Sequence, residues 1–315
     1  GIVFKELGNF EESEKSLRKA LNYEPKFNEA YNNLGNLLKN IGRLEEAEEN
    51  YKKSISINPN EAKVYHNLAN VLKDKGELEA AKINYRKAIE INPDLTSAEH
   101  MLLALSKEKT NSIPRAYIEE LFDVYASSFE DSLIRNLDYK IPKIISKIVL
   151  QKHNNSTLGS VLDLGCGTGL MGFEIKQHCS YLAGIDLSSL MIEEAKKKRI
   201  YDKLVCQDIL EYLEEGILDF DYFISSDVFI YFGDLSKLFQ LIKSRNKSSG
   251  KLIFTTEHLE AEDFRLEKSG RFSHSKSYIE GLCERFNYNL IHFEKVKLRK
   301  EKDSYIVGGL YALEF

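Results

Sequence analysis

The sequence has few cysteines and no long apolar run, and both shortages exclude classes of protein. Its four cysteines (Cys166, Cys179, Cys206 and Cys283) contain no C-x-x-C pair, so we expect reduced thiols in a cytoplasmic protein, with neither zinc nor any other metal. No stretch is long and apolar enough to cross a bilayer, and no signal peptide is visible. We therefore expect no membrane partner.

An excess of positive charge is also missing. The 315 residues include 44 lysines and arginines against 49 aspartates and glutamates, and the net charge of −5 argues against a general nucleic-acid binder. Lys295, Lys297 and Arg299 alternate along a predicted strand, which is typical of a solvated strand edge rather than a nucleic-acid site. The length is sufficient for about two domains.

The N-terminal third of the chain is repetitive. Pro25, Pro59 and Pro93 recur at a period of about 34 residues. This pattern resembles the tetratricopeptide repeat, in which two antiparallel helices form each unit and a proline ends it. The resemblance implies one partial repeat, two complete repeats over 28–61 and 62–95, and a capping helix. Because the chain begins partway through a repeat, we also expect further sequence ahead of it.

Asparagines recur at equivalent positions of the two complete repeats. Asn33 and Asn67 form one pair, Asn36 and Asn70 the other, and the spacing of three places each repeat's two asparagines on one helix face. Amide side chains can hold an extended peptide backbone without reading its sequence. The pattern resembles the asparagine ladder of O-linked N-acetylglucosamine transferases, which implies a peptide or protein acceptor on the concave face. A dimer surface or solvated polar residues are the alternatives.

A glycine loop follows the short apolar run 161–164 and precedes a helical pattern. Strand, glycine loop and helix together build nucleotide pockets at the carboxyl edge of open α/β sheets. Residues 167–172 match the dinucleotide fingerprint G-x-G-x-x-G, which is a weak signal alone. The wider string 163–169, an acid followed by G-x-G-x-G, resembles motif I of class I S-adenosylmethionine (SAM)-dependent methyltransferases. By that resemblance Asp163 positions the methionine part of SAM, and the loop wraps its amino acid and ribose through Gly165, Cys166, Gly167, Thr168 and Gly169.

Two more acids, Asp186 and Asp208, each end a predicted strand. A carboxylate at Asp186 is suited to accept both ribose hydroxyls, as in both nucleotide-binding families. The methyltransferase resemblance implies that Asp208 accepts from the adenine amino group. It also implies that apolar neighbours pack on the adenine ring, namely Leu187, Met191 and Ile209.

The segments around the predicted pocket supply further candidates. Residues 111–158 resemble the lid helices of bacterial methyltransferases fused to these repeats, where Tyr125 would touch the cofactor, although core packing explains it equally. The predicted fourth strand ends beside the first, at the point where ligands bind such sheets. We therefore expect Ser226 to contact the cofactor, and Asp227 and Tyr231 to line the acceptor site.

The polar stretch 264–275 lacks a clean period and is predicted to be a loop on the pocket side. It resembles the S-G-R-[FY]-x-H segment of the same repeat-fused methyltransferases. Arg271 is suited to bind a carboxylate of the acceptor. His274, or His258 nearby, is the candidate general base. An ordinary surface loop whose histidine caps the next helix is the alternative.

Together these features predict an N-terminal α-helical tetratricopeptide solenoid followed by a Rossmann-like, seven-stranded class I methyltransferase domain. We place the repeats and capping helix at 1–110 and the methyltransferase at 111–315, with its core at 159–315. The predicted reaction is SAM-dependent methyl transfer to an unidentified acceptor, with S-adenosylhomocysteine as product. A small-molecule methyltransferase with repeats used for dimerisation or docking remains open. A nicotinamide oxidoreductase is disfavoured because it does not account for Asp163 and Asp208. A non-catalytic scaffold is disfavoured because the cofactor-binding residues are intact.

Overall fold

The chain forms two compact units, Gly1–Glu108 and Lys109–Phe315, each with its own apolar core. The computed structural model describes residues 10–106, 108, 110–126, 129–131, 133–134, 137–152, 157–215, 218–260, 263–301 and 304–315. Among these residues, no helix is both long and apolar enough to cross a membrane.

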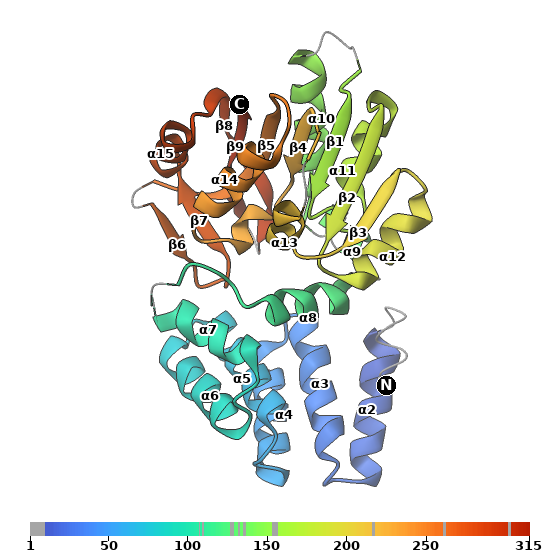
Figure 1. Ribbon diagram of the computed structural model, residues 1–315. Helices are drawn as coiled ribbons and strands as arrows, with labels where there is room; N and C mark the ends of the chain where they lie inside the picture. Colours follow the sequence, from blue (N-terminus) through green and yellow to red (C-terminus); the bar gives the residue numbers. More distant parts are fainter. Residues whose placement is uncertain are drawn as a thin grey trace. The chain divides into compact units, whose positions relative to one another are not determined.

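Unit 1 is a stack of paired helices (Figure 1). Close packing within a pair explains one of its small residues. A Cβ at Gly35 would lie 2.7 Å from the ring of the fully buried Tyr51, so a glycine is required where these two helices cross. The predicted α-helical solenoid is confirmed (Figure 1). Its helices are α2 (Phe10–Tyr23), α3 (Asn28–Asn40), α4 (Leu44–Ile57), α5 (Ala62–Lys75), α6 (Leu78–Ile91) and α7 (Thr96–Ser106).

Unit 2 is built on one mixed sheet, which confirms the predicted α/β class. Its main path runs β3-β2-β1-β4-β5-β7-β6, with β9 antiparallel to β5 and β8 antiparallel to β9. The strands are β1 (Ser160–Leu164), β2 (Tyr181–Asp186), β3 (Lys203–Cys206), β4 (Tyr222–Ser225), β5 (Lys251–Leu259), β6 (Phe264–Leu266), β7 (Phe272–Ser275), β8 (Asn289–Glu301) and β9 (Ser304–Glu314).

The described residues form nine strands, where seven were expected. The two additional strands, β6 and β7, come from the stretch predicted to be a loop. They form an antiparallel hairpin closed by a hydrogen bond from the Glu267 N–H to the Arg271 carbonyl (2.8 Å). Strands of three and four residues are too short to show a period-two pattern, so they could not be predicted from the sequence.

Helices cover both faces of this sheet (Figure 1). Alternation along β1 turns Leu162 toward the core shared with α14 and α15, and Val161 toward the core shared with α10 and α11. The helices are α8 (Arg115–Tyr125), α9 (Phe129–Asp131), α10 (Ile141–Lys152), α11 (Leu170–Ile175), α12 (Ser189–Lys198), α13 (Ile209–Glu214), α14 (Ser236–Arg245) and α15 (Lys276–Phe286), with 3₁₀ turns η3 (Lys176–His178) and η4 (Phe229–Tyr231).

The strand order reverses at β1. The chain runs from β1 outward through β2 to β3, and then returns to place β4 on the other side of β1. The connections that leave β1 and β4 therefore diverge at the carboxyl edge of the sheet. This arrangement opens a crevice at that edge, and ligands of doubly wound sheets bind there.

Candidate active site

The glycine loop is fixed against the neighbouring strands. The N–H groups of Gly165 and Cys166 both donate to the Ile185 carbonyl at the end of β2, at 2.9 and 2.8 Å. Gly165 has φ +73°, and a Cβ there would lie 2.5 Å from the Val228 side chain. A residue with a side chain would therefore be strained and would push the loop away from the segment after β4.

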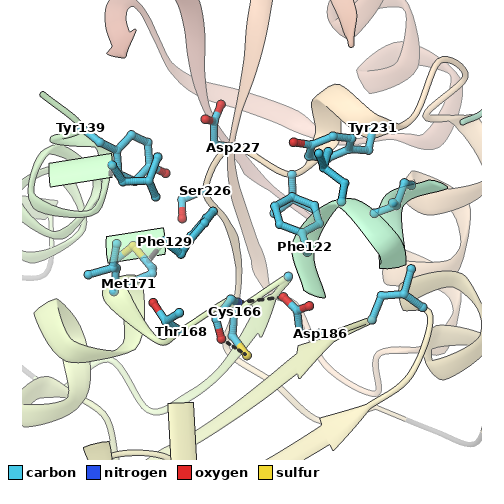
Figure 2. Close-up of a pocket in the computed structure, with 18 of the residues that line it drawn as sticks. Phe122, Phe129, Tyr139, Cys166, Thr168, Met171, Asp186, Ser226, Asp227 and Tyr231 are labelled. Atoms are coloured by element: carbon cyan, nitrogen blue, oxygen red, sulfur yellow. Dashed lines mark hydrogen bonds between the residues drawn. The ribbon is translucent and has the colours of Figure 1, made fainter. Parts of the chain in front are cut away.

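A cavity of ≈ 440 Å³ lies in front of this loop (Figure 2). Apolar side chains from α8 to Tyr139 form much of its wall, including Phe122 and Phe129, whose rings meet edge to face at 6.0 Å. Twelve of the predicted site residues line it: Gly165, Cys166, Gly167, Thr168, Asp186, Leu187, Asp208, Ile209, Ser226, Asp227, Tyr231 and Arg271.

Asp186 is the last residue of β2, and its carboxylate connects the glycine loop to α12. Oδ2 accepts from the Gly167 N–H (2.8 Å) and Oδ1 from the Ser188 N–H (2.9 Å). Burial raises the pKa of this carboxyl to about 6, and these backbone donors oppose the rise. Each oxygen retains a lone pair, so the carboxylate can accept further hydrogen bonds from a ligand in the cavity.

Asp208 ends the connection from β3 and caps α13. Its Oδ1 accepts from the N–H groups of Leu210 (2.8 Å) and Glu211 (3.2 Å). The described residues provide no donor to Oδ2, and the residue lines the cavity. An acceptor oxygen held in place by a helix cap is therefore available at the side of the cavity where Ile209 also lies.

Asp163 does not line the cavity, although it belongs to the same motif. As the penultimate residue of β1, it faces the opposite side from Leu162 and Leu164, and its fully buried Oδ2 accepts from the Tyr201 hydroxyl (2.7 Å). Burial raises the pKa of this carboxyl to about 7. The predicted direct contact with the methionine part of a cofactor does not fit this position beneath the loop.

Asp227 and Tyr231 lie at the end of the cavity away from Asp186 (Figure 2). The Asp227 carboxylate pairs through Oδ2 with Nη1 of Arg299, a residue of β8 that also lines the cavity. Nη2 of Arg299 lies 2.5 Å from Glu257 Oε1. The structure therefore adds Arg299 and Glu257 to this region, which sequence reasoning did not assign to the site.

Arg271 lines the cavity, as predicted, but its guanidinium already has two carboxylate partners. Nε lies 2.6 Å from Glu257 Oε1 and Nη2 lies 3.0 Å from Glu301 Oε1. Glu257 thus bridges Arg271 and Arg299. A carboxylate of a bound acceptor would have to compete with these internal pairs.

The two histidines predicted as bases lie outside the cavity lining. His274 is fully buried in β7, its Nε2 is 2.9 Å from the Gly233 carbonyl, and burial lowers its pKa to about 4. His258 is on the paired position of β5, with Nε2 3.5 Å from Glu260 Oε1. The prediction assumed a loop, whereas all four residues of β7 are buried and His274 lies in the core. Neither position fits a general base.

Two other predicted cofactor residues differ from expectation, and a third lies where the structure cannot test it. Gly169 and Met191 are not among the lining residues: Gly169 precedes α11 with φ +91°, and Met191 is fully buried within α12. Leu187 and Ile209 line the cavity instead. The side chain of Tyr125 lies outside the described residues, so its contact with a cofactor stays a prediction.

The repeat asparagines serve the packing of unit 1 as well as its surface. The buried Tyr51 and Tyr85 donate through their hydroxyls to Oδ1 of Asn36 (2.7 Å) and of Asn70 (2.6 Å). Asn67 donates through Nδ2 to Asn32 Oδ1 (3.1 Å). Both residues recur with the repeat, so the sequence shows this pairing as an Asn and a Tyr that are 15 positions apart in each unit. Asn33 is half-buried.

Comparisons with known proteins point to one enzyme class. The chain is 31% identical over 100 residues to a ubiquinone biosynthesis O-methyltransferase of Coxiella burnetii (30% of this chain, 42% of that protein). It is 29% identical over 136 residues to a probable S-adenosylmethionine-dependent methyltransferase of Saccharomyces cerevisiae (40% of this chain, 45% of that protein). The chain thus spans less than half the length of these relatives.

Solved structures and family models were compared as well. Magnesium protoporphyrin IX methyltransferase from Synechocystis PCC 6803 with bound SAM shares 17% identity and a TM-score of 0.48, covering 64% of this chain and 96% of that one. Residues 29–61 and 62–95 match models described as tetratricopeptide repeats, and 1–42 match a TPR repeat model. Residues 155–304 match a model described as a methyltransferase domain. The chain therefore carries N-terminal tetratricopeptide repeats followed by a C-terminal methyltransferase domain.

Proposed function

We propose that unit 2 transfers a methyl group from SAM to an acceptor bound in the same cavity. One observation carries this proposal: the glycine loop after β1, Asp186 at the end of β2 and Asp208 just beyond β3 line a single cavity. A dinucleotide would account for the loop and Asp186 alone. The methyltransferase resemblance assigns a second acid to the adenine of SAM, and Asp208 presents to the cavity an oxygen to which the described residues donate no hydrogen bond.

Four of the cavity residues have a definable task toward SAM, whose sulfonium carries the methyl group that is transferred. Asp186 accepts the ribose hydroxyls while its backbone partners hold the loop closed. Asp208 Oδ2 accepts the adenine amino group, and Leu187 and Ile209 provide the apolar contacts. The main contribution of the protein is to hold two reactants in line. The names of the curated relatives support methyl transfer as the reaction.

Calorimetry and label transfer test this function. S-adenosylhomocysteine should bind with a measurable heat, whereas NAD should give none. Incubation with methyl-labelled SAM and cell lysate should then place label in an acceptor. Absence of S-adenosylhomocysteine binding would refute the proposal. Binding of NAD in its place would favour the alternative hypothesis of a nicotinamide oxidoreductase.

For the acceptor, we propose a peptide or protein delivered by the repeats. The amide groups of Asn33 and Asn67 recur on equivalent turns of α3 and α5, and such a row suits an extended backbone. Because Asn36 and Asn70 already accept from buried tyrosines, only their amide N–H groups remain to contribute, and Asn70 Nδ2 already lies 3.4 Å from His66 Nε2. A small-molecule acceptor is the second candidate, favoured by the largely apolar and aromatic wall of the cavity.

Asn33→Ala combined with Asn67→Ala separates these candidates without removing a partner of a buried tyrosine. For a docked protein, the lysate concentration at half-maximal labelling should rise severalfold while the maximal rate stays nearly unchanged, since these contacts are equal in ground and transition states. Asn60→Ala, at the exposed turn between α4 and α5, is the matched control. Unchanged kinetics in the double variant would favour the small molecule.

A further inference from the structure

Asp227 has an unusual backbone conformation for a residue with a side chain. It follows β4 with φ +63°, in the left-handed region, and its N–H donates to the Thr255 hydroxyl (2.9 Å). Residues held in this region cost free energy and persist where the surrounding structure enforces them, commonly at functional sites. The conformation places the Asp227 side chain at the cavity end that Tyr139 and Tyr231 also line (Figure 2).

The two oxygens of this carboxylate have different surroundings. Oδ2 is paired with Arg299, whereas Oδ1 is buried and has no hydrogen-bond partner among the described residues. A buried acceptor without a donor is costly, so the site is complete only when a donor arrives. Arg299 fixes the carboxylate orientation from the other oxygen and is therefore a positioning residue.

The charges around Asp227 argue against an anionic ligand. Asp227 and Glu257 balance the two guanidinium groups of Arg271 and Arg299, and Glu301 adds a third carboxylate beside Arg271. A ligand carboxylate would enter a region whose cations are already neutralised, while Oδ1 would still lack a donor. The unsatisfied group calls for an O–H or N–H donor.

The cavity wall beside Asp227 is aromatic. Phe122 and Tyr231 meet edge to face with ring centroids 5.4 Å apart, and both line the cavity. Flat apolar groups pack favourably against such rings. The ligand chemistry that fits both features is a hydroxyl group on an aromatic ring, either in a small molecule or in a tyrosyl side chain.

We propose that Asp227 is a catalytic residue that accepts the proton of an aromatic hydroxyl on the methyl acceptor; this inference rests on the proposed methyl transfer. The hydroxyl oxygen forms a bond to the methyl carbon of the co-substrate SAM, and the carbon–sulfur bond breaks with its electron pair staying on sulfur. The hydroxyl proton passes to Asp227 Oδ1, which releases it to water when the methyl ether leaves. A carboxylate suffices as base, because an oxygen that gains a methyl group becomes strongly acidic.

Matched ligand pairs that differ by one hydroxyl test this role in the full chain. The first pair is 2-naphthol and naphthalene, and the second is N-acetyl-tyrosinamide and N-acetyl-phenylalaninamide. Binding is measured with saturating S-adenosylhomocysteine, by ligand fluorescence for the naphthalenes, since the chain has no tryptophan, and by calorimetry for the amides. The responding pair tells a small molecule from a tyrosyl acceptor.

Asp227→Asn is the decisive variant. Arg299 keeps donating to the asparagine oxygen, so the amide N–H₂ replaces Oδ1 and faces the hydroxyl as a second donor. The wild type should prefer the hydroxyl member of one pair by about tenfold or more, and the variant by less than about twofold. Its affinity for S-adenosylhomocysteine should stay within about threefold of wild type. Asp263→Asn, at an exposed carboxylate outside the cavity lining, is the control and should behave as wild type.

Three results would overturn the assignment. They are equal binding within both pairs by the wild type, a hydroxyl preference that survives in Asp227→Asn, and tighter binding of 2-naphthoate than of 2-naphthol by the wild type. The first and third are measured on the wild type, so they decide the matter even if the variant does not fold. In each case intact S-adenosylhomocysteine binding leaves the proposed function standing. Loss of that binding in the wild type would instead refute the proposed function.

Discussion

Replacing Asp186 with asparagine should separate its two duties, holding the glycine loop and accepting the ribose. The carboxylate offers an oxygen to each of two backbone donors, Gly167 at 2.8 Å and Ser188 at 2.9 Å. Asparagine has one oxygen, so its N–H₂ must face one of these donors. The variant therefore loses a loop contact and a ribose contact together.

The expected cost follows from hydrogen bonds to a charged acceptor, each of about 1.5–3 kcal/mol. Because the two losses share one side chain and are not additive, we expect about 2–4 kcal/mol in total, which raises the Kd of S-adenosylhomocysteine by about 30-fold to 1000-fold. Calorimetry measures this directly. Asp263→Asn, with its exposed carboxylate, should leave the Kd unchanged.

A modified ligand shows whether the ribose is the group that Asp186 recognises. The 2′-deoxy analogue of S-adenosylhomocysteine should bind the wild type more weakly than the parent ligand. In Asp186→Asn, removing the same hydroxyl should cost little more, because its acceptor is already lost. An equal penalty in both proteins would refute the ribose contact, even if the variant binds weakly.

The pH dependence provides a third check. The pKa of Asp186 is raised to about 6 by burial, so the carboxyl is protonated below that pH and loses acceptor capacity. Wild-type affinity for S-adenosylhomocysteine should therefore be constant above neutrality and fall below pH 6, approaching about tenfold per pH unit. Asp186→Asn should lack this dependence. A flat wild-type profile between pH 7 and pH 4.5 would contradict the proposed role of the ionised form.

Two further substitutions probe the residues around the loop and Asp227. Arg299→Met should lower the free energy of unfolding by about 3–5 kcal/mol in denaturant titration, because Asp227 loses its ion-pair partner and the buried Glu257 loses one of its two guanidinium partners. Lys297→Met, on the exposed side of the same strand, should cost little. Gly165→Ala should weaken S-adenosylhomocysteine by at least about tenfold and lower the melting temperature, since φ is +73° and the Cβ would lie 2.5 Å from the residue after Asp227; wild-type affinity would contradict the tight loop.

The parts of the fold that the sequence predicted are those set by local patterns. A sequence period of about 34 residues predicts a stack of helix pairs, and the repeats were confirmed. An apolar run that ends in an acid predicts a strand and its carboxyl end, so Asp186 and Asp208 could be placed at the sheet edge in advance. The strand pattern is contained within a few consecutive residues, and the helix-pair pattern recurs in each repeat. Both can therefore be read without knowing which distant segments are in contact.

The residues that sequence reasoning missed depend on contacts between distant segments. Arg299 comes 72 residues after Asp227, and its alternation with two lysines is the ordinary sign of a solvated strand edge. Only the sheet, which brings β8 beside β9 and β9 beside β5, moves this arginine next to Glu257. The prediction for His274 was wrong because its neighbours show no regular pattern, which favours a loop. These residues instead form a short strand in which the His274 ring is buried.

Gly172 completes a match to a dinucleotide-binding motif, but packing inside the protein explains why a glycine is present there. In that motif the third glycine allows close packing of helix and strand. In this protein a Cβ at Gly172 would lie 2.4 Å from the Tyr201 hydroxyl, which donates to Asp163 at 2.7 Å. The glycine is therefore required by the bond between Tyr201 and the first acid of the motif, beneath the loop. Since this internal contact fully accounts for Gly172, the third glycine gives no support to a dinucleotide, and the ligand must be inferred from the cavity side, where Asp186 and Asp208 lie.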